Sequence, residues 1–154
     1  MIDRRKFIKS LSSLGISLPL LSAKSFTTTA KNKKMNNPII LCSRGKDWAE
    51  DVLKPGWDIL RKNGSLLDAI EKSANVTELD PRDTSVGYGG LPNEDGVVQL
   101  DASIMYGPNH NCGSVAALEG IKTPSSVARL VMERTDHIHL VAEGAQNFAK
   151  MHGF

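Results

Sequence analysis

The stretch GVVQLDASIMYGPNHNCGSVAAL, Gly96–Leu118, decides the fold class of this chain of 154 residues. Its first half alternates apolar and polar residues, which is the period of a strand with one buried face. The apolar positions are Val98, Leu100 and Ala102. The second half, NCGSVAAL, is typical of another strand, and GPNHN between them has the residues of a hairpin turn. We therefore expect a pair of antiparallel strands here.

A strand and two helices are predicted ahead of this hairpin. NPIILCS, Asn37–Ser43, is a short apolar run rich in β-branched residues, which favours a buried strand. Pro55 can open a helix that Gly64 ends. Ser65 can cap a second helix, SLLDAIEKSANVTEL, in which apolar residues recur at helical spacing.

A helix, a strand and a last helix are predicted after the hairpin. KTPSSVARLVMERTDH has Thr123 as a cap and Pro124 at the first helical position. HIHLVAEG indicates a strand, and EGAQNFAKMHGF a short helix ended by Gly153. The expected order is β-α-α-β-β-α-β-α. Helices grouped around a paired antiparallel set predict an α+β or layered αββα fold rather than a doubly wound sheet.

The charge is divided unevenly along the chain. Residues 1–34 hold eight of the 19 Lys and Arg residues but only one of the 17 Asp and Glu residues. Arg4-Arg5, followed by an apolar stretch too short to cross a bilayer and then by small residues, resembles a twin-arginine export signal. We expect two parts: residues 1–34 as export signal and linker, and residues 35–154 as the folded domain. A periplasmic location follows, with membrane contact during export alone.

The folded part carries more acidic than basic residues, which argues against a nucleic-acid surface. Cys42 and Cys112 could form a disulfide, although a buried apolar role is commoner for a cysteine in a run such as PIILCS. Neither their spacing nor the histidines match a metal site. The glycines of TSVGYGGLPNEDG, Thr84–Gly96, fit neither the dinucleotide fingerprint nor a Walker loop. We expect no cofactor and no metal.

Three stretches in the right order resemble the glycosylasparaginases, also called aspartylglucosaminidases. They are NGSLLDAIEKSANVTELDP (63–81), DTSVGYGGLPNEDGVVQLDASIM (83–105) and CGSVAALEGIKTPSSVARLVMERTDHIHLVAEGAQNFAKMHGF (112–154). The resemblance covers roughly residues 38–154. It implies an N-terminal nucleophile hydrolase with a four-layer αββα sandwich that is incomplete in this chain. Such a precursor cleaves itself before a threonine, whose α-amine then serves as general base. The expected reaction cleaves the amide between asparagine and N-acetylglucosamine.

The resemblance also implies that the catalytic threonine lies downstream of this chain. Relatives carry it after a His-Asp pair, and nothing here matches His-Asp-Thr-Ile-Gly; Thr135-Asp136-His137 has the wrong order. This chain then corresponds to the N-terminal, α-subunit part, inactive alone. It would need a β-subunit segment from the same precursor and form an (αβ)2-type oligomer. An isoaspartyl peptidase or L-asparaginase, and a truncated remnant without activity, are the alternatives.

Five residues are candidates for the site. Ser85 matches a serine that supports the nucleophile in the family, and Gly87 and Gly89 would let the backbone lie close to it. The family usually places a tryptophan after the first strand. Here Arg44 occupies that position and Trp48 follows four residues later, so either side chain is a candidate for the pocket of an asparagine-like substrate. For Asp101 we expect a structural hydrogen bond rather than catalysis.

Overall fold

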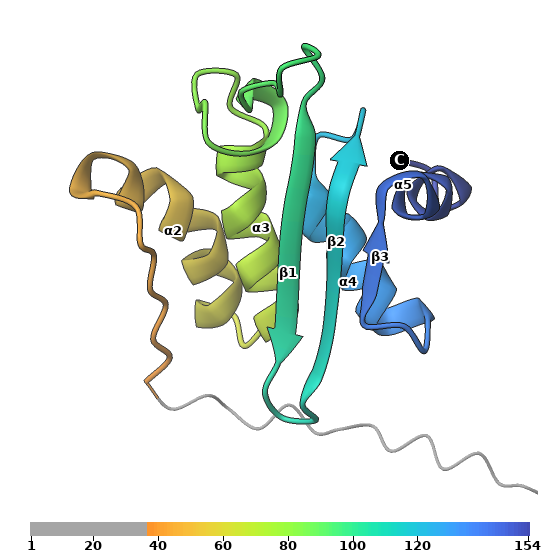
Figure 1. Ribbon diagram of the computed structural model, residues 1–154. Helices are drawn as coiled ribbons and strands as arrows, with labels where there is room; N and C mark the ends of the chain where they lie inside the picture. Colours follow the sequence, from red (N-terminus) through yellow and green to blue (C-terminus); the bar gives the residue numbers. More distant parts are fainter. Residues whose placement is uncertain (1–36) are drawn as a thin grey trace, which may run out of the picture. The chain divides into compact units, whose positions relative to one another are not determined.

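The computed structural model describes residues 37–154 (Figure 1). The predicted export signal and linker, residues 1–34, lie outside the described residues, so they stay predictions, as does the boundary at residue 35. Within the described part of the chain, no helix combines the length and the apolar character needed to cross a membrane.

A three-stranded sheet organises the domain. Strands β1 (Gln99–Tyr106) and β2 (Asn111–Glu119) form the antiparallel hairpin that the sequence predicts, and β3 (His139–Val141) pairs with β2 in parallel. The strand order is β1-β2-β3. This is a mixed α+β domain, which confirms the predicted class at that level.

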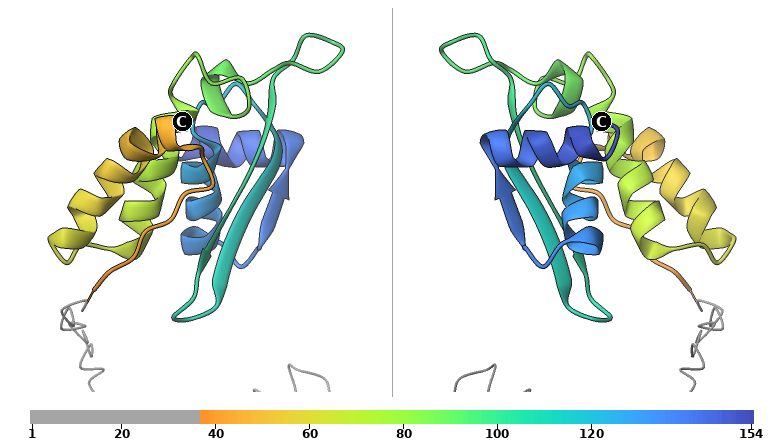
Figure 2. Two further views of the ribbon diagram at one scale, coloured as in Figure 1. Left: turned by 90° about the vertical axis from the view of Figure 1, so that its left-hand side faces the viewer. Right: turned by 90° about the vertical axis from the view of Figure 1, so that its right-hand side faces the viewer.

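Helix α4 (Pro124–Arg134) covers one face of the sheet, and α5 (Ala142–Met151) packs beside β2 and β3 (Figures 1 and 2). Thr123 is the N-cap of α4 and Pro124 its first residue, as predicted. The interface between α4 and the sheet is the centre of the core. Its fully buried side chains include Val115, Leu118, Val127 and Val131. Full burial of such a side chain stabilises the fold by roughly 1.5–3 kcal/mol.

Gly113 sets how closely α4 approaches β2. A Cβ atom on this residue would lie 2.3 Å from the carbonyl oxygen of Ala128 and 2.5 Å from the backbone nitrogen of Met132. Both are backbone atoms of the helix, so the helix cannot yield locally. The missing side chain therefore allows the direct contact between α4 and the strand.

The strand predicted at Asn37–Ser43 is wrong for the described part of the chain. The segment is extended but pairs with no strand among residues 37–154, and its Ile39 and Leu41 side chains are 79% and 86% exposed. The apolar run is typical of a strand, but this pattern alone does not supply a partner. A strand also needs a neighbour to satisfy its backbone groups, and none of the three strands lies beside it.

Helix α2 (Lys46–Arg61) begins well before Pro55, where the sequence predicted its start. The carbonyl oxygen of Gly45 accepts hydrogen bonds from the backbone N–H groups of Trp48 and Ala49, so the first turn forms ahead of the proline. Buried residues at helical spacing then outweigh the hydrogen bond that Pro55 removes. The helix ends as predicted near Gly64, although Asn63 takes the left-handed conformation, at φ 56°.

Helix α3 (Leu66–Glu78) has Ser65 as its N-cap, and the Ser65 hydroxyl accepts a hydrogen bond from the backbone N–H of Asp68 at 3.4 Å, as predicted. A charged cluster then joins α3 to α4. The Arg129 guanidinium donates to Asp68 at 2.7 Å, to Glu71 at 2.6 Å and to Glu133 at 2.8 Å. Partial burial acts to lower the pKa of Arg129, but the hydrogen bonds to Glu133, Asp68 and Glu71 outweigh it and hold this pKa above its ordinary value.

Replacing this arginine should weaken the contact between α3 and α4. We expect Arg129→Met to lower the free energy of unfolding by about 1–3 kcal/mol, since it leaves three carboxylates without their shared cation. Arg61→Met is the matched control, because Arg61 pairs with Asp58 on an exposed helix surface and its loss should change stability by about 0.5 kcal/mol or less. Urea unfolding of both variants measures the difference. Equal effects would show that the cluster contributes no more than a surface pair.

Candidate functional site

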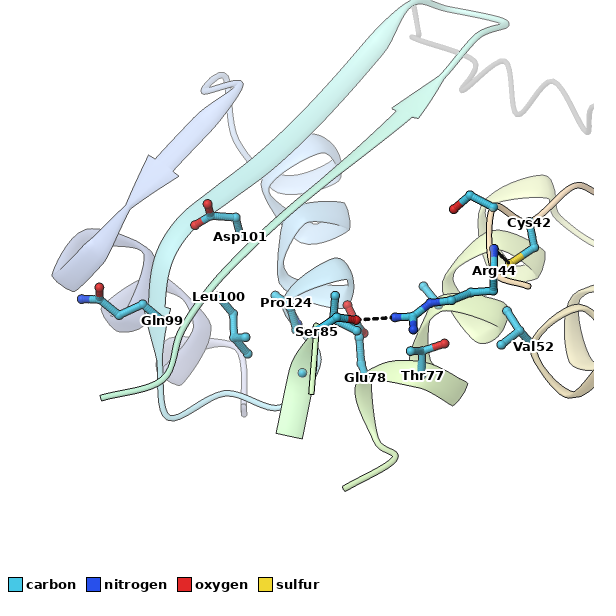
Figure 3. Close-up of a pocket in the computed structure, with 14 residues that line it drawn as sticks. Cys42, Arg44, Val52, Thr77, Glu78, Ser85, Gln99, Leu100, Asp101 and Pro124 are labelled. Carbon is cyan, nitrogen blue, oxygen red and sulfur yellow. Dashed lines mark hydrogen bonds between the residues drawn. The ribbon is translucent and has the colours of Figure 1, made fainter. Parts of the chain in front are cut away.

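A pocket with a volume of about 450 Å³ lies between the segment around Arg44, helix α3, the loop before β1, and β1 itself (Figure 3). Three of the five candidate residues line it: Arg44, Ser85 and Gly87. Gly89 and Trp48 are not among its lining residues. Three carboxylate- or thiol-bearing side chains, Cys42, Glu78 and Asp101, also line it.

Arg44 and Ser85, far apart in sequence, meet in this pocket. The Arg44 Nη2 group donates a hydrogen bond to the Ser85 hydroxyl at 2.7 Å, drawn as a dashed line in Figure 3. Both groups also bind Asp83, which the sequence analysis did not select. Ser85 Oγ donates to Asp83 Oδ1 at 2.6 Å, and Arg44 forms an ion pair with Asp83 Oδ2.

Asp83 is the buried centre of this cluster, with 4% of the residue exposed. Burial by itself acts to raise the pKa of the Asp83 carboxyl. Hydrogen bonds from the Ser85 side chain and backbone, and the Arg44 guanidinium, outweigh burial and hold this pKa below its ordinary value. The carboxylate is therefore the form that the folded domain prefers.

This pKa shift predicts how stability depends on pH. A carboxyl whose pKa is lowered by folding stabilises the domain above its unfolded-state pKa, roughly 4, and this contribution disappears as the pH falls through the lower folded-state pKa. At pH 7 we expect Asp83→Asn to lower the free energy of unfolding by about 1–3 kcal/mol. The difference from the wild type should shrink below about pH 4. Urea titrations at pH 7 and pH 3 measure it, and a difference that stays constant would contradict the assignment.

Glu78 forms a second buried polar contact on the pocket wall, with 5% of the residue exposed. Its carboxylate accepts hydrogen bonds from the Ser125 backbone N–H at 2.9 Å, the Ser125 hydroxyl at 2.8 Å and the Asn75 amide at 2.9 Å. Ser125 lies in the first turn of α4, whose N-cap Thr123 makes no side-chain cap bond. Glu78 therefore caps α4 from α3, where a negative charge is favourable.

Gly87 and Gly89 form the short 3-10 helix η1 (Gly87–Gly89) and pack against the chain itself. Gly87 has φ +63°, and a Cβ atom there would lie 2.1 Å from the carbonyl oxygen of Glu78. A Cβ on Gly89 would lie 2.3 Å from the carbonyl oxygen of Asp83. Both glycines therefore keep the loop close to the two buried acidic residues. Their expected approach to a nucleophile stays a prediction.

Asp101 has the structural hydrogen bond that the sequence analysis expected. Its carboxylate accepts from the backbone N–H of Ala117 at 2.8 Å. The pairing of β1 with β2 shifts register between Leu100 and Ala102, and Ala117 has φ 49°. The carboxylate thus replaces a missing ladder bond at a bulge.

Trp48 lies on α2 and forms a cation–π contact with Arg82, whose guanidinium carbon is 5.8 Å from the ring centroid. Its predicted place in a substrate pocket stays a prediction.

Cys42 and Cys112 are not joined to each other, and both are half-buried. Within residues 37–154 no group of three or more His, Cys, Asp and Glu side chains is arranged to hold a metal ion.

Comparison of the sequence with known proteins identifies the family of this chain. A family model described as asparaginase matches residues 29–154. The chain belongs to the asparaginase family. It is 46% identical, over 99% of its length, to N(4)-(β-N-acetylglucosaminyl)-L-asparaginase from Elizabethkingia miricola. The resemblance to the glycosylasparaginases is thereby confirmed.

Other relatives in the asparaginase family match a shorter part of the chain. A plant-type L-asparaginase from Pyrococcus horikoshii is 50% identical over 64% of the chain, and an isoaspartyl peptidase/L-asparaginase from Xenopus laevis is 46% identical over 66%. The chain spans 44% of the length of the Elizabethkingia relative and 32% of the length of the other two.

Two residues of the site in this asparaginase-family chain, Asp83 and Glu78, were not predicted from the sequence. Asp83 precedes Ser85 by two positions, and this spacing is typical of a side chain that bonds the backbone of its own turn. That local signal could have identified Asp83. The sequence carries no local signal for Glu78, because its partner Ser125 is remote in sequence. The contact depends on how α3 packs against α4.

Proposed function

We propose that this chain forms one wall of the active site of an asparaginase-type amidohydrolase that cleaves the amide between asparagine and N-acetylglucosamine. The identity of 46% over 99% of the chain with the Elizabethkingia relative carries this proposal. The plant-type asparaginases and isoaspartyl peptidases match about two thirds of the chain.

The nucleophile in this proposal is a threonine from a segment outside residues 1–154, freed by self-cleavage. Its α-amine removes the proton from its own hydroxyl, and the oxygen attacks the side-chain carbonyl carbon of the substrate. The amide C–N bond breaks as the protonated amine returns the proton to the leaving nitrogen. Water then hydrolyses the ester and releases aspartate. Ser85 supports the nucleophile from the pocket wall, and Arg44 and Trp48 are the candidate contacts to the substrate.

The remaining features of the proposal follow from the same resemblance. The second segment completes the four-layer αββα sandwich as a β-subunit, and the assembled protein is an (αβ)2-type oligomer. The twin-arginine-like sequence at Arg4-Arg5 exports it to the periplasm.

A second candidate function is hydrolysis of asparagine or of an isoaspartyl peptide. One observation favours it: Arg44 stands where the glycosylasparaginase resemblance calls for a tryptophan, and its guanidinium is held in place by Asp83 and Ser85. A tryptophan at that position would stack on the substrate, whereas a guanidinium can bind a carboxylate of the substrate.

Reconstitution tests both candidates. The full chain would be co-expressed with the part of the Elizabethkingia relative that follows the matched region, and the product assayed for aspartate release. The substrates are asparaginyl-N-acetylglucosamine, L-asparagine and a β-aspartyl dipeptide. We expect activity from the reconstituted protein, highest on the glycosylated substrate, and none from the chain alone. Activity of the chain alone would overturn the placement of the nucleophile, and preference for another substrate would select the second candidate.

A further inference from the structure

The sheet face opposite α4 is open within the described part of the chain. In Figure 1 this face is turned toward the viewer, and α4 lies behind the strands. The residues that alternate with the core positions lie on it: Ser103 and Met105 on β1, Ser114 and Ala116 on β2, and His139 and Val141 on β3. Met105 and Val141 are 67% and 49% exposed, and the side chains between them are small or polar. Such a face is suited to packing against another layer.

His139 lines a hollow of about 460 Å³ on this face, together with Asp101, Ser103 and Ser114. Its Nδ1 atom lies 2.7 Å from Ser114 Oγ, and the Ser114 hydroxyl donates to the carbonyl oxygen of Ile138 at 2.9 Å. A hydroxyl has a single proton, and a carbonyl oxygen can only accept. The neutral imidazole must therefore carry its proton on Nδ1 and donate it to Ser114. The Nε2 atom is left with a lone pair.

Protonation of His139 would place a second N–H donor and a positive charge at Nε2. Histidine is the side chain whose charge most readily changes between pH 5 and pH 8. A layer packed on this face would bury the ring, and a buried charge is unfavourable unless it gains an acceptor or a counter-ion.

Asp101 is the other ionisable side chain that lines the hollow. Within the described residues its carboxylate is bonded to the Ala117 backbone N–H at 2.8 Å rather than to the imidazole. Ionisable residues on the other elements packed against β3 do not line the hollow: Cys112 on β2, Arg134 at the end of α4 and Glu143 at the start of α5. The described chain therefore gives a charged His139 no partner at Nε2.

We propose that His139 makes packing on this sheet face dependent on pH. The face binds the second segment of the precursor when His139 is neutral and excludes it when His139 is charged. The choice of occupant rests on the proposed function, in which a segment outside residues 1–154 completes the fold. The Elizabethkingia relative is long enough to include one, because the chain spans 44% of its length. Since the bound state holds fewer protons, the complex is stable at neutral pH and weakens as the pH falls.

The proton position is tested on the full chain by NMR at pH 8, without any partner. We expect long-range proton–nitrogen correlations to show His139 as the Nδ1–H tautomer, with the signals assigned by their loss in His139→Leu. Ser114→Ala removes the acceptor and should release the ring from this tautomer. An Nε2–H tautomer in the wild type, or an unchanged ring in Ser114→Ala, would overturn the proposal.

The pH dependence is tested on the complex obtained by co-expression with the second segment of the Elizabethkingia relative. Gel filtration over a dilution series gives the dissociation constant at pH 7.5 and pH 5.5. We expect it to rise by about tenfold at pH 5.5 in the wild type, because excluding one proton weakens binding tenfold for each pH unit over which the histidine is charged. His139→Leu should remove this rise. His137→Leu is the matched control, since His137 is exposed on the same segment but outside the hollow, and it should keep the rise.

The same pH dependence in the wild type and in His139→Leu would overturn the proposal. Tighter association at pH 5.5, or no association at either pH, would also overturn it. Self-association of the chain alone that is lost at low pH and becomes independent of pH in His139→Leu would assign the face to a second copy and refute the chosen occupant.

The assay of the proposed function gives a separate answer. A complex with the expected pH dependence that cleaves none of the three substrates would contradict the proposed function and leave the role of His139 standing. An active complex whose association does not depend on His139 would do the reverse.

Discussion

Gly87→Ala is expected to destabilise the domain by about 2–5 kcal/mol, the largest effect of any single methyl group added to the pocket wall. Two penalties combine at this residue. Its φ of +63° is unfavourable for alanine by roughly 1–2 kcal/mol, and the new Cβ would lie 2.1 Å from the Glu78 carbonyl oxygen and 2.3 Å from the Glu78 Cα atom. Because both neighbours are backbone atoms at the end of α3, the loop itself must move away.

Gly96→Ala separates these two penalties. Gly96 also has a positive φ, +78°, but nothing lies within 4 Å of its Cβ position. Its substitution should therefore cost about 1–2 kcal/mol, the backbone part alone. Urea unfolding of the two variants gives the difference directly. If Gly87→Ala were no worse than Gly96→Ala, the close approach of the loop to Glu78 would be refuted.

The second large effect is expected at the centre of the core. Gly113→Ala should lower the free energy of unfolding by about 1–3 kcal/mol, because the added methyl group would meet the backbone of α4 at Ala128 and Met132. Gly113 does not have a positive φ, so this penalty comes from overpacking rather than from backbone strain.

Gly107→Ala is the matched control on the same hairpin. No atom lies within 4 Å of the Cβ position of Gly107, and stability should change by about 0.5 kcal/mol or less. Thermal unfolding of both variants measures the contrast, and near-UV circular dichroism reports whether the packing of α4 has loosened. A neutral Gly113→Ala would mean that α4 moves away from β2 at no measurable cost.

The elements that were predictable from sequence are those whose signals are local. The β1–β2 hairpin has alternating strands around a polar turn, and α4 has Thr123 and Pro124 at its start, so each carries its own boundary information. The predicted start of α2 was wrong because the prediction made Pro55 the first helical residue. The helix already begins with the turn at Gly45, ten residues earlier. The strand predicted at Asn37–Ser43 was wrong, because pairing depends on a partner strand that no local pattern provides.

The candidate site divides in the same way. Ser85 and Arg44 were selected through the family resemblance, and their direct hydrogen bond became visible once the fold brought the two segments together. The glycines were expected to make room for a nucleophile. Within residues 37–154, Gly87 and Gly89 instead make room for the backbone of Glu78 and Asp83. No spacing in the sequence reveals this contact.

The segment Asn37–Ser43, which pairs with no strand among residues 37–154, affects how the chain behaves at high concentration. An extended run that leaves Ile39 and Leu41 exposed is a template onto which a second molecule can add a strand. Self-association through this segment would add strands in the manner of a β-aggregate. Charged substitutions at these two exposed positions, such as Ile39→Lys and Leu41→Glu, should therefore keep the chain in solution while its chemistry is studied.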